Sequence, residues 1–374
     1  MPSPRDILRK TRRLVVKVGT RVLLADGGGL DSARIDRLVG EIAALRARGV
    51  HVVLVSSGAI GAGLGPMGFA KRPTTIPELQ ATAAVGQSLL MQAYNALLAP
   101  RGWAAAQILL THEDFRDRER YLNVRNTMVA LEGRPVLAVV NENDTVAVDE
   151  IKFGDNDVLS ALVANVIDAD LLVILSDVDG LHDAPPGRGA RTRRIDIVEA
   201  VTPDIEALAG DSRSGLGTGG MKTKLRAAKI AAAAGAAVVL AHGPTASLEA
   251  IRNGDDLGTL FLPAVNRLDH RQRWIAHSLR EAGSVTLDAG GARALREGGR
   301  SLLPAGVKAC EGEFRVGDAI AIRGPDGRAV AKGISNYGAA DVRRIMGRRT
   351  PDLAKLLGDR YFDEVVHRNN MVVF

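Results

Sequence analysis

Apolar residues in the first 262 positions fall into short runs that alternate with longer helical patterns. Leu14–Val18 is a β-branched run of strand length, which predicts a buried first strand. The next segment places apolar residues three and four positions apart, between an N-cap at Asp31 and a stop at Gly49, and this spacing predicts a helix. A second run, His51–Val55, predicts the next strand.

The same alternation continues along the chain. Further helices are predicted at about 77–99, 119–132, 156–168 and 221–234, and further strands at about 104–110, 136–140, 171–175 and 237–241. Strands separated by helices of this length are βαβ units. They predict an α/β fold in which a mainly parallel sheet is sandwiched by helices.

The pattern changes after Pro263. Short apolar runs follow at 284–287, 314–316, 319–322 and 329–334, with turn signals such as Gly290-Gly291 and Gly298-Gly299 between them. We therefore expect an α/β domain over residues 1–264, a linker over 265–280, and a small β-rich domain with the C-terminal tail over 281–374.

Composition narrows the possible functions. Hydrophobic residues make up 46% and charged residues 25%, which is typical of a globular protein. The net charge of +6 suits an anionic substrate as readily as nucleic acid, and aromatic residues reach only 3%, too few for a base-stacking surface. Cys310 is the single cysteine, so no internal disulfide can form, and the longest apolar stretch, 231–241, is too short to cross a membrane. We expect a cytoplasmic protein without membrane contact.

Ligands of open parallel sheets bind beyond the carboxyl ends of the strands, and polar or glycine-rich segments follow the predicted strands here. Lys17 lies in an apolar strand, where its ammonium group is unfavourable unless it reaches a polar site such as a phosphate, or else the surface. Ser56–Gly63 is rich in small residues that let backbone N–H groups approach an anion at a helix start. Such turns are common after strands, so this second signal is weak by itself.

Two further segments carry candidate chemistry. Residues 141–144 and 152–157 gather carboxylates and amides that could hold an ammonium group or a hydrated metal, or form a solvated acidic loop. No His/Cys spacing suggests a dedicated metal site. Residues 215–224 form a glycine-rich turn that opens a helix and places Lys224 near an anion, unless the turn is only a surface loop. They match G-x-G-x-x-G, but no strand directly precedes them, so the dinucleotide reading lacks its context.

Taken together, the chain resembles the amino-acid kinase family, and within it the branch that phosphorylates the side-chain carboxylate of glutamate. The motifs VVKVGT, SSGAIGAG, NENDTVA, IKFGDNDVLSALVA, ILSDVDGL and AGDSRSGLGTGGMKTKLRAA carry this resemblance over residues 13–262. GSVTLDAGGARAL, SLLPAGV and GRAVAKGISNY resemble a PUA domain, which bacterial members of this branch often carry. The resemblance implies ATP with Mg²⁺ on its phosphates, glutamate as acceptor in the first step of proline biosynthesis, feedback inhibition by proline, and a homo-oligomer (dimer or tetramer).

The resemblance also assigns roles to matching positions. Lys17 and Lys224 would neutralise the transferring phosphoryl group, and Asp157 would hold both lysines. The substrate-binding residues would be Ser57, Gly58, Asn141, Asp144, Asp155 and Asn156. The ATP-binding residues would be Lys17, Ser176, Asp177, Thr218, Gly219, Gly220, Met221, Lys222, Thr223 and Lys224. The segment 182–186 departs from the family's Tyr-Thr-x-Asp-Pro, which leaves the nucleotide contacts of the loop at 181–194 open.

Two alternatives remain at this point. One is another kinase of the same fold, acting on N-acetylglutamate, aspartate or UMP; the acidic residues Asp144 and Asp155 favour a free ammonium group over an N-acetyl group. The other is an RNA-binding protein acting through the PUA-like domain, against which stand its small positive charge and few aromatics. The sequence shows no Ser-His-Asp set, which agrees with a carboxylate nucleophile that is already ionised at neutral pH.

Overall fold

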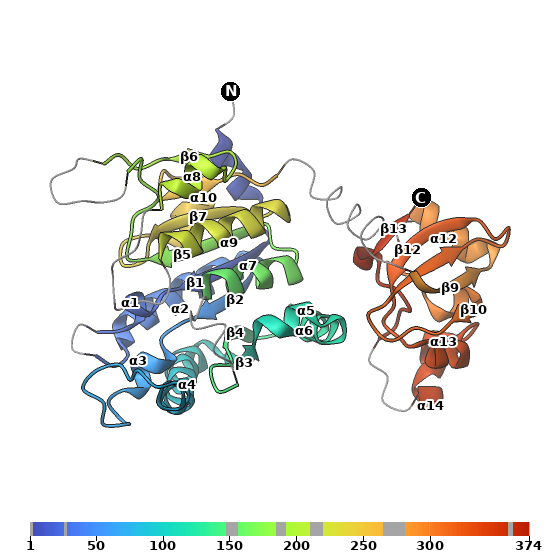
Figure 1. The fold of residues 1–374 in the computed structure, drawn as a ribbon, viewed down its shortest axis with the longest axis horizontal. Helices are drawn as coiled ribbons and strands as arrows, with labels where there is room; N and C mark the ends of the chain where they lie inside the picture. Colours follow the sequence, from blue (N-terminus) through green and yellow to red (C-terminus); the bar gives the residue numbers. More distant parts are fainter. Residues whose placement is uncertain are drawn as a thin grey trace. The chain divides into compact units, whose positions relative to one another are not determined.

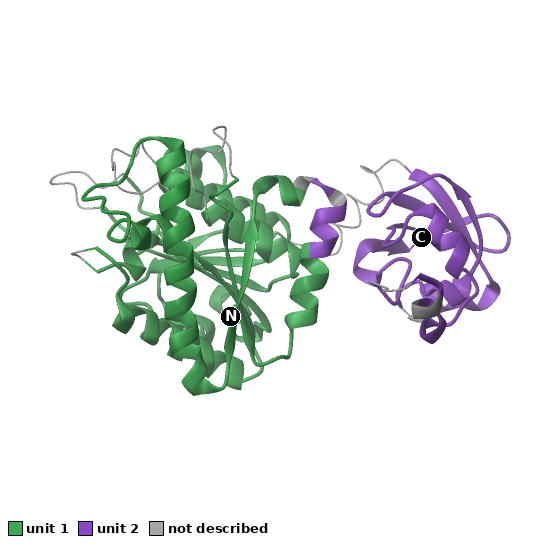
Figure 2. Cartoon of the chain, turned by 90° about the horizontal axis from the view of Figure 1, so that it is seen from below, with its two compact units in different colours: residues 1–115, 124–265 green, residues 116–123, 266–374 purple. Residues whose placement is uncertain are grey.

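The computed structural model describes residues 3–25, 28–146, 156–184, 192–209, 220–264, 281–298, 300–357 and 362–373. They belong to two compact units (Figure 1, Figure 2). The first unit comprises Met1–Phe115 and Val124–Val265, and the second comprises Arg116–Asn123 and Asn266–Phe374. The predicted linker at 265–280 lies outside the described residues.

The first unit contains an eight-stranded sheet with the order β3-β4-β2-β1-β5-β7-β8-β6. The strands are β1 Arg13–Val18, β2 His51–Ser56, β3 Ala104–Leu110, β4 Val136–Glu142, β5 Leu171–Ser176, β6 Ile197–Val198, β7 Ala237–His242 and β8 Thr259–Phe261. Neighbouring strands pair in parallel except β7 and β8, which are antiparallel. The predicted mainly parallel sheet is therefore confirmed.

The helices between residues 4 and 253 are interspersed with these strands (Figure 1). They are η1 Pro4–Lys10, α1 Thr20–Leu23, α2 Ser32–Ala47, α3 Ala59–Gly63, α4 Ile76–Leu98, η2 Ala99–Arg101, α5 His112–Arg116, α6 Arg118–Leu131, α7 Asn156–Val166, α8 Pro203–Ala207, α9 Met221–Ala233 and α10 Leu248–Asn253. All five long helices predicted from the sequence are confirmed. Asp31 caps α2 as expected, because its side chain accepts hydrogen bonds from the N–H groups of Ala33 and Arg34.

Side chains of β1 alternate between two helical layers. Leu14, Val16 and Val18 are buried in a core shared with residues of α2 and α4. Because successive side chains of a strand point to opposite faces, Val15 and Lys17 face the other layer, which contains α7 and α9. Strand periodicity thus directs the ammonium group of Lys17 toward these two helices.

The second unit contains a five-stranded sheet with the order β10-β9-β11-β12-β13. Its strands are β9 Glu281–Leu287, β10 Val307–Gly312, β11 Ala319–Arg323, β12 Ala329–Ile334 and β13 Met371–Val373. Its helices are α12 Ala289–Gly298, η5 Pro304–Gly306, α13 Ala339–Ile345, η6 Thr350–Asp352, α14 Leu353–Leu357 and η7 Arg368–Asn370. Residues of the sheet, of α12 and of α13 share one apolar core, so the expected compact domain with a sheet is confirmed.

Two details of the sequence prediction for this unit were wrong. Residues 314–316 are not a strand; Phe314 is apolar because it fills the core from a loop between β10 and β11. Gly290 and Gly291 do not mark a turn but lie in the first turn of α12, where Asp288 Oδ1 accepts a hydrogen bond from the Gly291 N–H group at 2.7 Å. This cap and the burial of Ala292 and Leu295 outweigh the low helix propensity of glycine.

Candidate functional site

Asp157 lies between two lysines beyond the carboxyl end of β1. Its Oδ1 atom is 2.6 Å from Lys17 Nζ, and its Oδ2 atom is 3.0 Å from Lys224 Nζ. The three side chains are 1%, 8% and 8% exposed, respectively. Thr223 Oγ1 lies 2.9 Å from both Asp157 Oδ2 and the Gly220 carbonyl oxygen, which ties the start of α9 to the same carboxylate. The structure therefore brings together β1, α7 and α9 through three residues singled out in the sequence.

The charges of this triad are well defined. Burial alone would raise the pKa of Asp157, but the adjacent ammonium groups of Lys17 and Lys224 outweigh burial and hold that pKa well below its usual range. The carboxylate is therefore ionised, and the triad of two ammonium groups and one carboxylate has a net charge of +1. A buried positive charge at the end of a parallel sheet suits a phosphate or another anion.

A tight glycine-containing turn follows β2 beside the triad. The Ser57 N–H group donates to the Val18 carbonyl oxygen at 3.1 Å, and Gly58 then adopts φ +105°, a left-handed conformation that glycine permits. The short helix α3 begins directly afterwards and packs against α4. A Cβ atom at Gly86 of α4 would lie only 1.7 Å from the Ala59 carbonyl oxygen, so a side chain there would push α3 away.

Three further predicted residues meet through their side chains. Asn156, the first residue of α7, has its Nδ2 atom 2.9 Å from Ser57 Oγ and 3.0 Å from Asn141 Oδ1. Asn141 Nδ2 donates in turn to Gln87 Oε1 at 2.9 Å. Gln87 was missed in the sequence, because a single glutamine on an apolar helix gives no motif.

Asp144 follows β4 in a turn. Burial raises the pKa of Asp144 to about 6, and the nearby guanidinium group of Arg72 opposes this shift. Arg72 was also missed, because it lies in a polar segment before α4 that carries no recognisable pattern. The predicted site residues Asp155, Thr218 and Gly219 lie outside the described part of the chain.

Apart from Lys17 on β1, the described residues expected to contact ATP lie at the carboxyl end of β5 and at the start of α9. Ser176 Oγ donates to Asp177 Oδ1 at 3.0 Å, and Asp177 Oδ2 pairs with Arg21 Nη1 at 2.6 Å. Burial would raise the pKa of Asp177, but its hydrogen bonds, including the one from Ser176, and its pairing with Arg21 lower the pKa below its usual value. Gly220 caps α9, whose first four residues are Met221, the exposed Lys222, Thr223 and Lys224.

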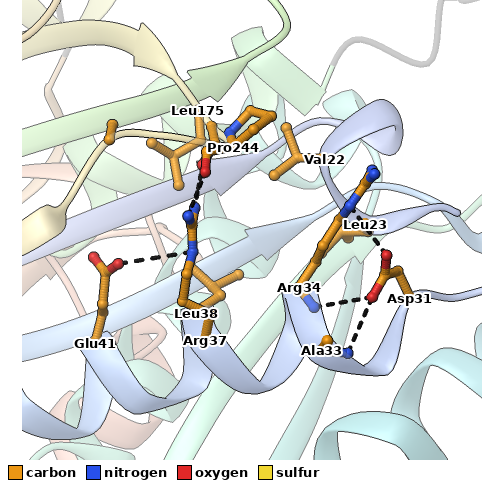
Figure 3. A pocket seen from close by; sticks show the side chains of 12 residues that line it. Val22, Leu23, Asp31, Ala33, Arg34, Arg37, Leu38, Glu41, Leu175 and Pro244 are labelled. Atoms are coloured by element: carbon orange, nitrogen blue, oxygen red, sulfur yellow. Dashed lines mark hydrogen bonds and ion pairs between the residues drawn. The ribbon is translucent and has the colours of Figure 1, made fainter.

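A separate cavity of about 260 Å³ opens on the α2 side, near the carboxyl ends of β1, β5 and β7 (Figure 3). Its charged side chains already have partners within the protein. Arg37 Nη2 donates to the Gly243 carbonyl oxygen at 2.5 Å, and Arg34 Nε pairs with Asp31 Oδ2 at 3.1 Å. The Arg37 contact holds α2 against the segment after β7, and the two contacts account for both arginines without a ligand.

The described residues contain neither a cluster of metal-binding side chains nor a helix that could span a membrane. Within the described ranges, no three His, Cys, Asp or Glu side chains are grouped so that they could hold a metal ion. No described helix combines the length and the apolar character needed to cross a bilayer.

Two family models and several curated relatives match this chain. The model of the amino acid kinase family matches residues 12–242, and that of the PUA domain matches residues 283–357. The glutamate 5-kinase of Trichlorobacter lovleyi is 49% identical over 370 residues, which cover 99% of this chain and 98% of that protein. The glutamate 5-kinase of Stutzerimonas stutzeri is 48% identical over 370 residues, covering 99% and 100%. Among solved structures, carbamate kinase from Giardia lamblia bound to AMP-PNP is 19% identical and covers 68% of this chain and 99% of that chain, with a TM-score of 0.46.

Proposed function

The chain belongs to the amino acid kinase family, and from this premise we propose that it transfers the γ-phosphoryl group of ATP to the side-chain carboxylate of L-glutamate. The product is glutamyl 5-phosphate, the first intermediate of proline biosynthesis. The observation that carries the proposal is the buried set of Lys17, Asp157 and Lys224 at the carboxyl end of the sheet. Full-length similarity to glutamate 5-kinases supports the choice of acceptor.

The chemistry needs positive charge more than it needs a base. The side-chain carboxylate of glutamate is ionised at neutral pH, so it can attack phosphorus without losing a proton. The main obstacle is the approach of two anions, and two lysines beside the reacting groups would lower it. One ammonium group about 4 Å from a unit negative charge contributes about 4 kcal/mol at an effective dielectric constant of roughly 20. Asp157 acts in this scheme by holding both lysines in place.

Amide and carboxylate groups would recognise the amino-acid end of the acceptor. Asn156 lies within hydrogen-bonding distance of both Ser57 and Asn141, and Asp144 comes shortly after Asn141, just beyond the end of β4. A free ammonium group is a natural partner for amide and carboxylate oxygens, whereas an N-acetyl group carries no such charge. These neighbours support glutamate over N-acetylglutamate, with Gly58 and Asp155 as further proposed contacts.

The carboxyl end of β5 and the start of α9 would bind the nucleotide. We assign it to Ser176, Asp177 and residues 218–224, together with Lys17. Both oxygens of Asp157 already pair with lysines, and Asp177 pairs with Arg21, so these carboxylates suit a site whose magnesium arrives on the nucleotide phosphates. The ion would there neutralise phosphate charge.

The direct experiment measures ADP release with glutamate, N-acetylglutamate, aspartate and UMP offered in parallel. We expect glutamate to be used best, and hydroxylamine should trap its acyl phosphate product as a hydroxamate. Preference for another acceptor in this panel, or ADP release without a trappable acyl phosphate, would refute the proposal.

Other expectations rest on the family alone. We propose that proline inhibits the enzyme by competing with glutamate, that the chain forms a homo-oligomer, and that it acts in the cytoplasm. Inhibition kinetics with proline at several glutamate concentrations test the first of these. Light scattering after size-exclusion chromatography tests the second, and a monomer would contradict it.

A further inference from the structure

Asn156 has one side-chain atom whose hydrogen-bonding capacity is unused within the described residues. The residue is 8% exposed, and its Oδ1 atom is buried without a partner there. Its Nδ2 atom, by contrast, faces three acceptors: Ser57 Oγ at 2.9 Å, Asn141 Oδ1 at 3.0 Å and the Ser56 carbonyl oxygen at 3.3 Å. A buried acceptor left open in this way is unfavourable unless a donor arrives with a ligand.

The orientation of the neighbouring amides follows from one backbone group. The Glu142 N–H group can only donate, and it lies 2.9 Å from Asn141 Oδ1. Asn141 must therefore place its oxygen there and its Nδ2 atom on the opposite side, where Gln87 Oε1 accepts at 2.9 Å. The Nε2 atom of Gln87 then donates to Gln107 Oε1 at 3.1 Å. In this hydrogen-bonded series, the side-chain amides of Asn141, Gln87 and Gln107 therefore each have one orientation that suits their partners.

This direction determines which atom Asn156 presents to the site. Asn141 Oδ1 and the Ser56 carbonyl oxygen are both acceptors, so the atom of Asn156 that faces them must be the nitrogen. The side-chain oxygen of Asn156 consequently points away from Asn141 and from the Ser56 carbonyl group. That oxygen can only accept a hydrogen bond, and the ammonium group of an amino acid can only donate.

Gln87 is the last buried residue in this series of hydrogen-bonded amides, counted outward from Asn156. It is 9% exposed on α4, next to Gly86, whose lack of a side chain lets α4 contact α3. Gln107 is exposed and lies on β3, at the edge of the sheet. Water can replace an exposed Gln107 as the partner of Gln87, but the acceptor opposite Asn141 has to come from Gln87.

We infer that Gln87 is a positioning residue for the acceptor amino acid: its Oε1 atom helps hold Asn141 in the orientation that leaves Asn156 Oδ1 to accept a hydrogen bond from the substrate ammonium group. The inference rests on the proposed function, because it takes the acceptor to be an amino acid. It concerns recognition of the ammonium group and leaves phosphoryl transfer itself to the lysine triad.

Two variants of Gln87 separate polarity from packing. Gln87→Met keeps the approximate shape but removes the acceptor, and it should raise the KM for glutamate about tenfold, as expected for one lost hydrogen bond in a binding site, with the KM for ATP unchanged. Gln87→Glu keeps an acceptor opposite Asn141 and should raise the KM for glutamate much less. Gln107→Met is the matched control at the exposed end and should leave both constants unchanged. A purely structural role predicts the reverse order, because a buried Glu disturbs packing more than Met.

Glutarate tests the ammonium contact directly, because it has both carboxylates of glutamate but no ammonium group. Its inhibition constant should be the same for the wild type and for Gln87→Met. An equal loss of affinity for glutarate and glutamate, or a Met variant that binds glutamate as well as the Glu variant does, would overturn the inference.

A measurement without substrate separates failure of the inference from failure of the proposed function. Both side-chain amide hydrogens of Asn156 are donated in this arrangement, so NMR should show that they exchange slowly in the wild type and faster in Gln87→Met. Unprotected hydrogens in the wild type would overturn the inference whichever acceptor the enzyme uses. Slow exchange together with no activity on glutamate would uphold the amide orientation and refute the proposed function alone.

Discussion

Replacing Asp157 with asparagine tests whether the two lysines depend on a single carboxylate. The substitution preserves shape but removes the only charge that lies between Lys17 and Lys224 in the described structure. Two buried ammonium groups then repel one another without compensation. We expect Asp157→Asn to weaken both the fold and catalysis but to raise the affinity for ATP, because the lost carboxylate repels phosphate while both lysines remain.

The expected magnitude follows from the two distances. At an effective dielectric constant of roughly 20, ion pairs at 2.6 Å and 3.0 Å contribute about 6 and about 5.5 kcal/mol before desolvation is counted. Desolvation of three buried charges offsets most of this, and removing one partner of a buried pair typically costs about 3–5 kcal/mol. We therefore expect the free energy of unfolding to fall by about 3–5 kcal/mol. Because the lysines lose their anchor, kcat should fall about a hundredfold or more.

Urea unfolding, steady-state kinetics and calorimetric titration with an ATP analogue measure the three quantities. Asp36→Asn is the control, since it makes the same chemical change in an exposed pair with Arg101 and should alter stability by less than about 1 kcal/mol. Saturating nucleotide should restore part of the stability of Asp157→Asn, because phosphate replaces the missing anion. Unfolding free energy equal to that of the control, or unchanged kcat, would refute the proposed dependence.

Four further outcomes are expected. Lys17→Ala and Lys224→Ala should each lower kcat about a hundredfold or more while circular dichroism shows an intact fold; wild-type turnover in both would mean that the site lies elsewhere. The value of kcat/KM for glutamate should fall as the pH drops through about 6, because protonation of Asp144 removes the charge that attracts the ammonium group. Asp144→Asn should raise the KM for glutamate, leave that for ATP unchanged, and abolish this pH dependence; equal effects on both substrates would indicate a structural role. Gly86→Ala should lower the free energy of unfolding by about 1–3 kcal/mol in urea titrations, because its Cβ atom would meet the Ala59 carbonyl oxygen, and a neutral effect would show that α3 can move freely.

Long periodic segments made most of the first unit predictable. Runs such as Leu14–Val18 bury every residue on both faces of a parallel sheet, so their apolar character is strong and local. Elements of two to six residues, such as β6, β8 and α10, carry too little periodicity to be recognised. The antiparallel pairing of β7 with β8 depends on contacts between distant segments and leaves no local pattern.

The charged residues of the site were easier to predict from the sequence than the neutral ones. Lys17 stands out because a cation in an apolar strand is unfavourable without a partner, and Lys224 follows a glycine-rich helix start. Gln87 gives no such signal. Its role depends on how closely α4 approaches the end of β4, which is set by Gly86 and by packing against α3.

Asn156 and Asp157 are consecutive residues in the first turn of α7, so one rigid element determines the distance between amino-acid recognition and phosphoryl transfer. In our proposal Asn156 binds the ammonium end of the acceptor. Asp157 holds the two lysines beside which the side-chain carboxylate of the acceptor reacts. The two contacts cannot move independently, because both side chains leave the same helical turn and both are buried. We therefore expect an acceptor one methylene shorter, such as aspartate, to be used poorly, because it would have to reach Asn156 and the lysines across the same separation. Chain length would thus be selected by the spacing of two neighbouring side chains, without a dedicated pocket wall.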